Sequence, residues 1–150
     1  MRWAIAPDVN VLVAAFRADH PHYTTARIWL EQALTQAASG ATLCVMPMVT
    51  ANFLRLVTSP KIFQQPTPTA DAVSFVDALL AASGVRQTAA GAEWPRMRLL
   101  CLERQLSGND LPDVWLAACV MHDGEHLVTF DRDFRGLLPK GQLTVLAAKP

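Results

Sequence analysis

The sequence has no excess of either charge, and its few cysteines form no recognisable pattern. Thirteen basic residues are balanced by 13 acidic residues, so the formal net charge is zero at pH 7. This balance excludes the broad positive field of non-specific nucleic-acid binders, and any contact with a polyanion must come from a local patch. Cys44, Cys101 and Cys119 are scattered through apolar runs, which predicts buried thiols in a reducing compartment rather than disulfides or a zinc site.

Long hydrophobic runs are also absent. The apolar N-terminal segment is short, contains Pro7 and Asp8, and lacks a small-residue cleavage site, so we expect a cytoplasmic protein without a signal peptide or membrane span. Because 51% of the 150 residues are hydrophobic, the chain can bury a sizeable core and keep apolar surface for self-association or a partner. Residues 64–69, the clearest break, are too short for a linker, and we expect one domain over residues 1–150.

Hydrophobic periodicity predicts strands that alternate with helices. Helical spacing covers residues 23–38, 47–58, 69–82, 93–106 and 111–122, with a further helix just after Asp8. Short apolar runs predict strands at residues 3–6, 43–46, 85–88, 126–130 and 143–147. In the helix 69–82, Val73, Val76 and Leu80 are expected to face inward. Strands separated by helices form right-handed crossovers, so we expect an α/β fold with a mostly parallel sheet covered on both faces.

Three carboxylates are expected at one edge of that sheet. Asp8 directly follows the first predicted strand, and Asp131 directly follows the strand HLVTF, with Asp133 two residues further on. Asp113 stands in the first turn of the last long helix, on its apolar side, so its side chain should point inward. Ligand sites of parallel sheets lie beyond the carboxyl ends of the strands, which predicts that Asp8, Asp113 and Asp131 converge there.

Converging carboxylates repel one another, and a hard divalent cation such as Mg²⁺ or Mn²⁺ relieves this repulsion. A cation held there can activate water and neutralise charge on a phosphoryl group, so phosphodiester hydrolysis is the reaction that the arrangement favours. Each acid also has an ordinary structural interpretation, because an aspartate after a strand often caps a helix or shapes a turn. The functional interpretation rests on the three acids meeting at one edge.

Four segments carry a resemblance to a known family. The resemblance is to the PIN-domain ribonucleases, above all the VapC toxins of bacterial toxin–antitoxin pairs, and the segments are, in chain order, APDVNVLVAAF, the early helix DHPHY–ARIWLE, MPMVTANFLRLVTSP and GNDLPDVWLAACVMHDGEHLVTFDRDF. The resemblance implies a three-layer α/β/α sandwich and a Mg²⁺- or Mn²⁺-dependent endoribonuclease. It also implies a homodimer and a cognate antitoxin that inhibits the enzyme.

The resemblance assigns the site position by position. Three of the family's four acidic positions match Asp8, Asp113 and Asp131. Thr129 and Asn109 match polar positions that often support the site, whereas Asp133 matches a frequent but less central acid. If RNA is the substrate, Arg132 and Arg135 beside the acidic edge are the best candidates for binding its phosphates, and solvated surface charge is the alternative for each.

The remaining acidic position departs from the family pattern, because Asn52 stands where a glutamate is usual. Periodicity predicts that Asn52 shares the inward face of its helix with Val49 and Phe53. Asparagine keeps an oxygen for a metal-bound water but loses a charge, so metal affinity should fall. Asp110 could replace part of that charge, although a helix cap is the preferred interpretation of this residue.

The substitution at position 52 leaves three possibilities open. The enzyme cuts RNA with a weakened metal site, or it is a degenerate member that binds antitoxin or RNA without cleavage, or this chain carries a deliberate or accidental Glu-to-Asn change. A different metal phosphohydrolase that uses Asp131 and Asp133 as an Asp-x-Asp pair is disfavoured. In such enzymes the pair usually closes the first strand, and here it follows a late one.

Overall fold

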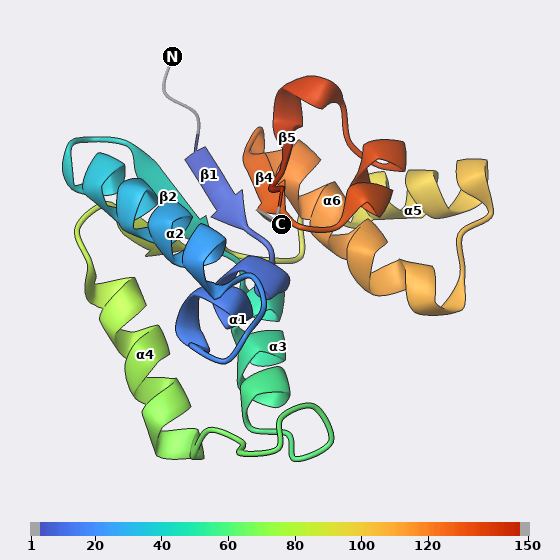
Figure 1. Cartoon of the computed structure of the whole chain (residues 1–150). Coiled ribbons are helices and arrows are strands. Elements are labelled where there is room, and N and C mark those ends of the chain that lie inside the picture. The colour runs from blue at the N-terminus through green and yellow to red at the C-terminus, as the bar shows by residue number, and fades with distance from the viewer. Residues whose placement is uncertain (1–3, 148–150) are drawn as a thin grey trace.

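Five parallel strands form the sheet of the computed structural model, which describes residues 4–147 (Figure 1). The strands are β1 (Ala4–Pro7), β2 (Thr42–Val45), β3 (Val85–Gln87), β4 (His126–Thr129) and β5 (Leu143–Val145). They pair in the order β3-β2-β1-β4-β5, and every pairing is parallel. This confirms the predicted parallel sheet. Trp3, which begins the first predicted strand, lies outside the described residues.

Helices occupy the segments between the strands. They are α1 (Val9–Phe16), α2 (Tyr23–Ala38), α3 (Pro47–Val57), α4 (Thr69–Ala81), α5 (Trp94–Arg104) and α6 (Leu111–Asp123). In Figure 1, α1 to α4 gather on the left and α5 with α6 on the right, with β1 and β4 between the two groups. The predicted α/β sandwich is therefore confirmed, and the predicted element boundaries lie within about two residues of those observed.

Three short 3₁₀ helices were not predicted: η1 (Gly108–Asp110), η2 (Arg132–Gly136) and η3 (Lys140–Gln142). Each has only three to five residues, too few for a hydrophobic period to show in the sequence. Two of them adjoin the predicted acids, because η1 leads into α6, which carries Asp113, and η2 begins directly after Asp131.

The centre of the sheet is the point where the strand order reverses. From β1 the chain builds β2 and β3 on one side and then returns to place β4 and β5 on the other. The register pairs Pro7 with Val128, so the next residues, Asp8 and Thr129, emerge together at the carboxyl edge. Proline is tolerated there because it is the last residue of its strand, and the following N–H of Asp8 donates to the Val128 carbonyl at 2.8 Å. Such a switch point is where parallel sheets bind ligands.

The main core packs α1 against the sheet and against α2 and α3, and every residue of α1 from Val11 to Ala15 is buried. A second, smaller cluster of Leu100, Val114 and Ala118 joins α5 to α6. The expectation for Val73 was wrong, because its side chain is 39% exposed. α4 instead buries Ala72 and Leu79, and the small Ala72 allows the helix to approach the core closely.

Apolar surface remains on α5, as the composition predicted. Trp94 and Leu102 are about 60% exposed, and Leu100 is the buried residue of this helix. Cys44 and Cys119 are buried and Cys101 is half-buried, all as free thiols, which confirms buried thiols for two of the three. Within residues 4–147, no helix combines the length and the hydrophobicity needed to cross a membrane.

Candidate functional site

Asp8 lies at the end of the central strand and caps the helix that follows. Its backbone is extended, and its side chain accepts a hydrogen bond from the Val9 N–H at 2.7 Å, which satisfies a free donor at the start of α1. The side chain is 7% exposed. Burial raises the pKa of Asp8, the nearby charge of Asp131 raises it further, and hydrogen bonds from Thr129 and Val9 act in the opposite direction.

Thr129 connects the strand ends, and its fully buried hydroxyl donates to Asp8 Oδ2 at 2.8 Å. The Thr129 hydroxyl oxygen also accepts hydrogen bonds, from Asn10 Nδ2 at 3.1 Å and from the Asp131 N–H at 3.0 Å. Asn10 Oδ1 in turn accepts from the Phe130 N–H at 3.2 Å. Asn10 therefore locks the start of α1 onto the end of β4. Sequence reasoning did not assign Asn10 to the site, although the Asp-x-Asn spacing at positions 8–10 was the available signal.

Replacing Thr129 by valine is expected to destabilise the fold by about 1–3 kcal/mol, because buried polar groups around it lose their partner. Asp8 loses a donor, while Asn10 and the Asp131 N–H lose an acceptor. Urea unfolding compared with Thr24→Val, a change at an exposed position of α2, measures the effect. Equal midpoints for the two variants would contradict this account of the network.

Asp131 stands two residues after the end of β4 and caps η2 by accepting the Asp133 N–H at 2.9 Å. The cap turns the chain sharply, and the fully buried Phe134 anchors the turn in the core. Asp131 is half-buried and Asp133 is exposed. The carboxylate of Asp131 is thus held by its own backbone turn at the edge where Asp8 emerges.

Asp113 extends from the first turn of α6 toward the same acids. Burial raises its pKa to about 6, and the charges of Asp8 and Asp131 contribute next, followed by those of Asp133 and Asp110. These interactions require the carboxylates of β1, α6 and η2 to lie within electrostatic range of one another. The charges of Asp8 and Asp131 thus act on Asp113, and the direct links in this region are those that Thr129 makes to Asp8 and to the Asp131 backbone.

A cleft of about 310 Å³ opens beside these acids. It is lined by Asp113, Asp110, Asp133, Arg104, Leu106, Val114, Gly136 and Leu137. Asp110 accepts the Ser107 N–H at 3.2 Å and completes a capping box with Ser107. It therefore caps a helix, as predicted, but the helix is η1 and not α6. Asn109, expected to support the site, is an exposed residue of η1, and no hydrogen bond joins its side chain to the site acids within the described chain.

Asn52 is half-buried between the buried Val49 and Phe53, in line with the predicted face of α3. Its Oδ1 lies 3.4 Å from Arg55 Nε, a long hydrogen bond within the same helix. The structure thus places Asn52 on the helix that follows β2, with its side chain joined to Arg55 of the same helix.

The predicted phosphate-binding arginines are not among the residues that line the acidic cleft. Arg135 lines a separate cleft of about 500 Å³ with Lys140, Leu138, Leu143 and Val145. Arg132 is exposed on η2 and does not line either cleft. The cation in the acidic cleft is Arg104, at the end of α5. No sequence motif marked Arg104, because its position depends on how α5 packs against α6.

The acids have the chemistry of a Mg²⁺ or Mn²⁺ site. Asp8, Asp113 and Asp131 supply the hard oxygen donors that these ions prefer, and their repulsion is what a divalent cation relieves. No ready-made cage of three or more carboxylate, imidazole or thiol groups exists among residues 4–147. Mg²⁺ does not need one, because it keeps several waters and usually binds through one or two carboxylates and substrate phosphates. The donors therefore fit an open, hydrated ion better than a closed structural site.

Known proteins share both the sequence and the fold. Residues 5–137 match the family model described as PIN domain. Ribonuclease VapC25 of Mycobacterium tuberculosis is 41% identical over 131 residues, which cover 85% of this chain and 88% of that protein. VapC ribonuclease Mb2897 of Mycobacterium bovis is 37% identical over 128 residues, with 85% of each chain covered.

Two solved structures have the same fold at low sequence identity. The crystal structure of VapBC2 from Rickettsia felis, bound to a DNA fragment from its promoter, superposes with a TM-score of 0.63 at 17% identity and covers 95% of this chain and 98% of that one. Mycobacterium tuberculosis VapC20, described as a sarcin–ricin loop cleaving toxin, gives a TM-score of 0.59 at 18% identity, with 89% and 94% covered.

Proposed function

This chain belongs to the PIN-domain family, and we propose that it is a metal-dependent endoribonuclease, the toxin of a type II toxin–antitoxin pair. The observation that carries the proposal is the switch point of the sheet, where the Thr129 hydroxyl at the end of β4 donates to Asp8 at the end of β1 and accepts the Asp131 N–H, with Asp113 in the first turn of α6. Relatives named ribonucleases, at 41% and 37% identity over most of the chain, support RNA as the substrate.

In the proposed mechanism Asp8, Asp113 and Asp131 would hold a Mg²⁺ or Mn²⁺ ion, with Asn52 in the place of a fourth acid. When bound, the ion activates a water molecule and neutralises charge on the phosphoryl group. Thr129 and Asn10 fix the Asp8 carboxylate and the end of β4, so the donors are held in place before RNA binds. Asp133, on the turn that Asp131 caps, would add to the negative charge around Asp113.

The proposal extends to partners. The Rickettsia felis structure is described as a VapBC complex, which supports a cognate antitoxin for this chain as well. We also expect a homodimer, and the exposed Trp94, Leu99 and Leu102 of α5 supply apolar surface for association. A cytoplasmic location follows from the same proposal, because RNA and antitoxin would both be met there.

Incubation of the protein with structured and single-stranded RNA tests the function. We expect cleavage with Mn²⁺ or Mg²⁺, none with EDTA, and recovery when the metal is restored in excess. Asp77→Asn, at an exposed position of α4 away from the site, serves as the control and should cleave like the parent. Cleavage that survives EDTA would contradict a metal-dependent nuclease.

A second candidate function follows from Asn52. A chain that lacks the fourth acid could retain the fold and the partner surface while losing cleavage, which would make it a binding module for antitoxin or RNA. Binding of RNA or antitoxin without any cleavage in Mn²⁺ would identify this case.

A further inference from the structure

Arg104 is the one cation among the described residues that line the acidic cleft. The other polar side chains of that lining are the carboxylates of Asp110, Asp113 and Asp133. A polyanion such as RNA is repelled by these walls unless positive charge compensates for them. The position of Arg104 therefore decides where in the cleft a phosphate can lie.

The charge of Arg104 is not neutralised by the neighbouring acids. Within residues 4–147 the ion pairs closer than 4.0 Å are Arg17–Asp19 and Arg27–Glu31, and neither includes Arg104. Arg17 shows the contrast, because it also donates to the Gln65 carbonyl and lies 4.1 Å from the centre of the Phe63 ring. Arg104 thus keeps its guanidinium donors for a ligand.

The backbone holds Arg104 in place at the end of α5. The next residue, Gln105, adopts the left-handed conformation with a φ of 52°, the one non-glycine residue with positive φ in the described part of the chain. Such a conformation is costly for a side chain with a Cβ atom and persists where the surrounding structure requires it. Leu100, one turn earlier, packs against Val114 and Ala118 of α6 and ties this end of α5 to the helix that carries Asp113.

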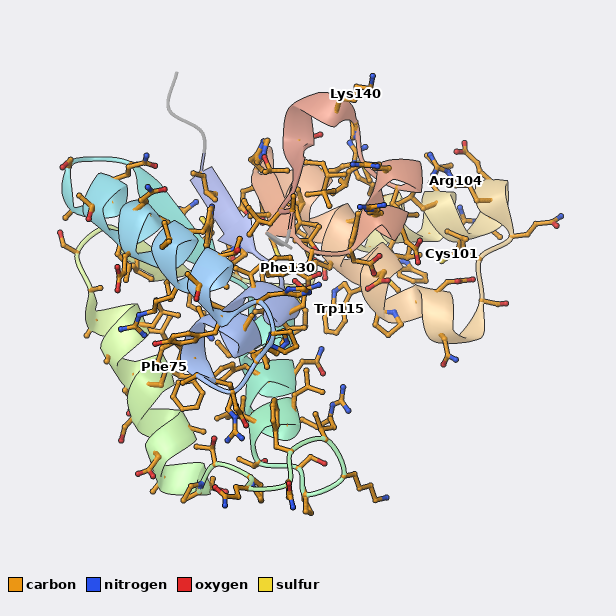
Figure 2. The ribbon with its side chains drawn as sticks, viewed as in Figure 1. Phe75, Cys101, Arg104, Trp115, Phe130 and Lys140 are labelled. Atoms are coloured by element: carbon orange, nitrogen blue, oxygen red, sulfur yellow. The ribbon has the colours of Figure 1, made fainter. Side chains whose placement is uncertain are left out.

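Arg104 also lies apart from the residues at the end of β4. Figure 2 shows its side chain toward the outer end of α5, well apart from Phe130, which directly follows Thr129. A phosphate bound to the ion and a phosphate bound to Arg104 would therefore be different phosphates of one strand. Arginine suits this task because its planar fork donates two parallel hydrogen bonds to phosphate oxygens.

We propose that Arg104 binds a phosphate of the RNA strand that flanks the one being cut, and so positions the strand across the acidic cleft. This inference rests on the proposed ribonuclease function and adds a substrate-binding residue to it. It predicts that loss of Arg104 weakens RNA binding through one ionic contact and leaves the metal site intact.

The test measures binding of a fluorescein-labelled, mixed-sequence, single-stranded oligoribonucleotide by anisotropy at several salt concentrations. All variants are made in the Asp113→Asn background, so that cleavage does not interfere. Arg104→Ala should weaken binding roughly tenfold at low salt and reduce the slope of log K against log salt by about 0.7, the value for one lost contact with a single strand. Arg104→Lys should restore the slope but only part of the affinity, because lysine cannot form the paired hydrogen bonds.

Arg98→Ala is the matched control, because Arg98 is exposed on the same helix and does not line the cleft. It removes the same charge from the chain and should leave both affinity and slope unchanged. The role of Arg104 alone would be overturned if Arg104→Ala and Arg98→Ala had equal effects on binding, while the Asp113→Asn protein binds RNA and the chain without the Asp113 substitution cleaves it. Absence of RNA cleavage by the chain that keeps Asp113 would overturn the proposed function and, with it, this inference.

Discussion

Asp113→Asn is expected to lower RNA cleavage at least ~100-fold and, in the same protein, to make the metal-free fold more stable. The first effect follows because the substitution removes a charged oxygen ligand from the proposed ion. The second follows because Asp113, once ionised, lies among the like charges of Asp8 and Asp131 in a partly buried position. Loss of activity with a gain of stability is the signature of a residue retained for function.

The gain in stability depends on pH, and its sign follows from the raised pKa of Asp113. The folded-state pKa of about 6 exceeds the ordinary value of 3.8, so the folded chain binds the proton more tightly than the unfolded chain. Stability of the parent therefore falls as pH rises through that interval and stays lower above it. Asparagine does not titrate, so Asp113→Asn should exceed the parent by about 1 kcal/mol near pH 8, after allowance for solvent screening of this half-exposed group.

Thermal or urea unfolding in EDTA, at pH values on both sides of this interval, measures the difference. It should vanish below about pH 3, well under the ordinary value of 3.8, where Asp113 is protonated in both the folded and the unfolded chain. Added Mn²⁺ should stabilise the parent more than the variant, because a ligand stabilises the state that binds it. Asp77→Asn, at an exposed position of α4, should show neither effect. A variant less stable than the parent at high pH would contradict the repulsion among the acids.

Asn52→Glu is expected to increase cleavage at limiting Mn²⁺ by about tenfold or more. The change adds a carboxylate on the inward side of α3, where the family usually has one, and stronger metal binding should follow from the extra charge. In EDTA the same variant should be less stable than the parent, because the added charge increases the repulsion that already raises the pKa of Asp113.

Cleavage rates titrated with Mn²⁺ in the parent, Asn52→Glu and Asn52→Gln test this prediction. Glutamine has nearly the size of glutamate but no charge, so a gain confined to glutamate would assign the effect to the carboxylate. If the parent does not cleave and Asn52→Glu does, the parent is the degenerate binding module. If glutamate and glutamine behave alike, Asn52 does not occupy an acidic position of the metal site.

The helices and strands could be predicted because their signals are local. Helical periodicity predicted a helix over residues 23–38, and α2 has the same bounds. The alternation of helices and strands was enough to indicate a parallel sheet. The prediction for Val73 failed because the buried side of α4 depends on how closely the helix approaches its neighbours. The small Ala72 allowed a contact that a count of large apolar residues could not predict.

The candidate site was predicted in part, for a similar reason. Asp8 and Asp131 each follow a strand, and the carboxyl ends of parallel strands meet at one edge, so their proximity followed from topology. The role of Asn10 did not follow, because its hydrogen bonds to Thr129 and Phe130 link residues about 120 positions apart. Asn109 was assigned a supporting role from its matching position alone, and the structure leaves it exposed on η1.

By itself, the sequence determined the kinds of elements, their order and the set of acids at the strand ends, because periodicity and turn residues act over a few positions. Only the tertiary structure decided which arginine enters the acidic cleft. Arg132 and Arg135 are neighbours of Asp131 in the chain, yet Arg104 lines the cleft because Leu100 packs against Val114 and Ala118. Such packing joins distant segments through contacts that leave no local pattern, so the direction of a side chain on a docked helix emerges only when the whole chain is folded.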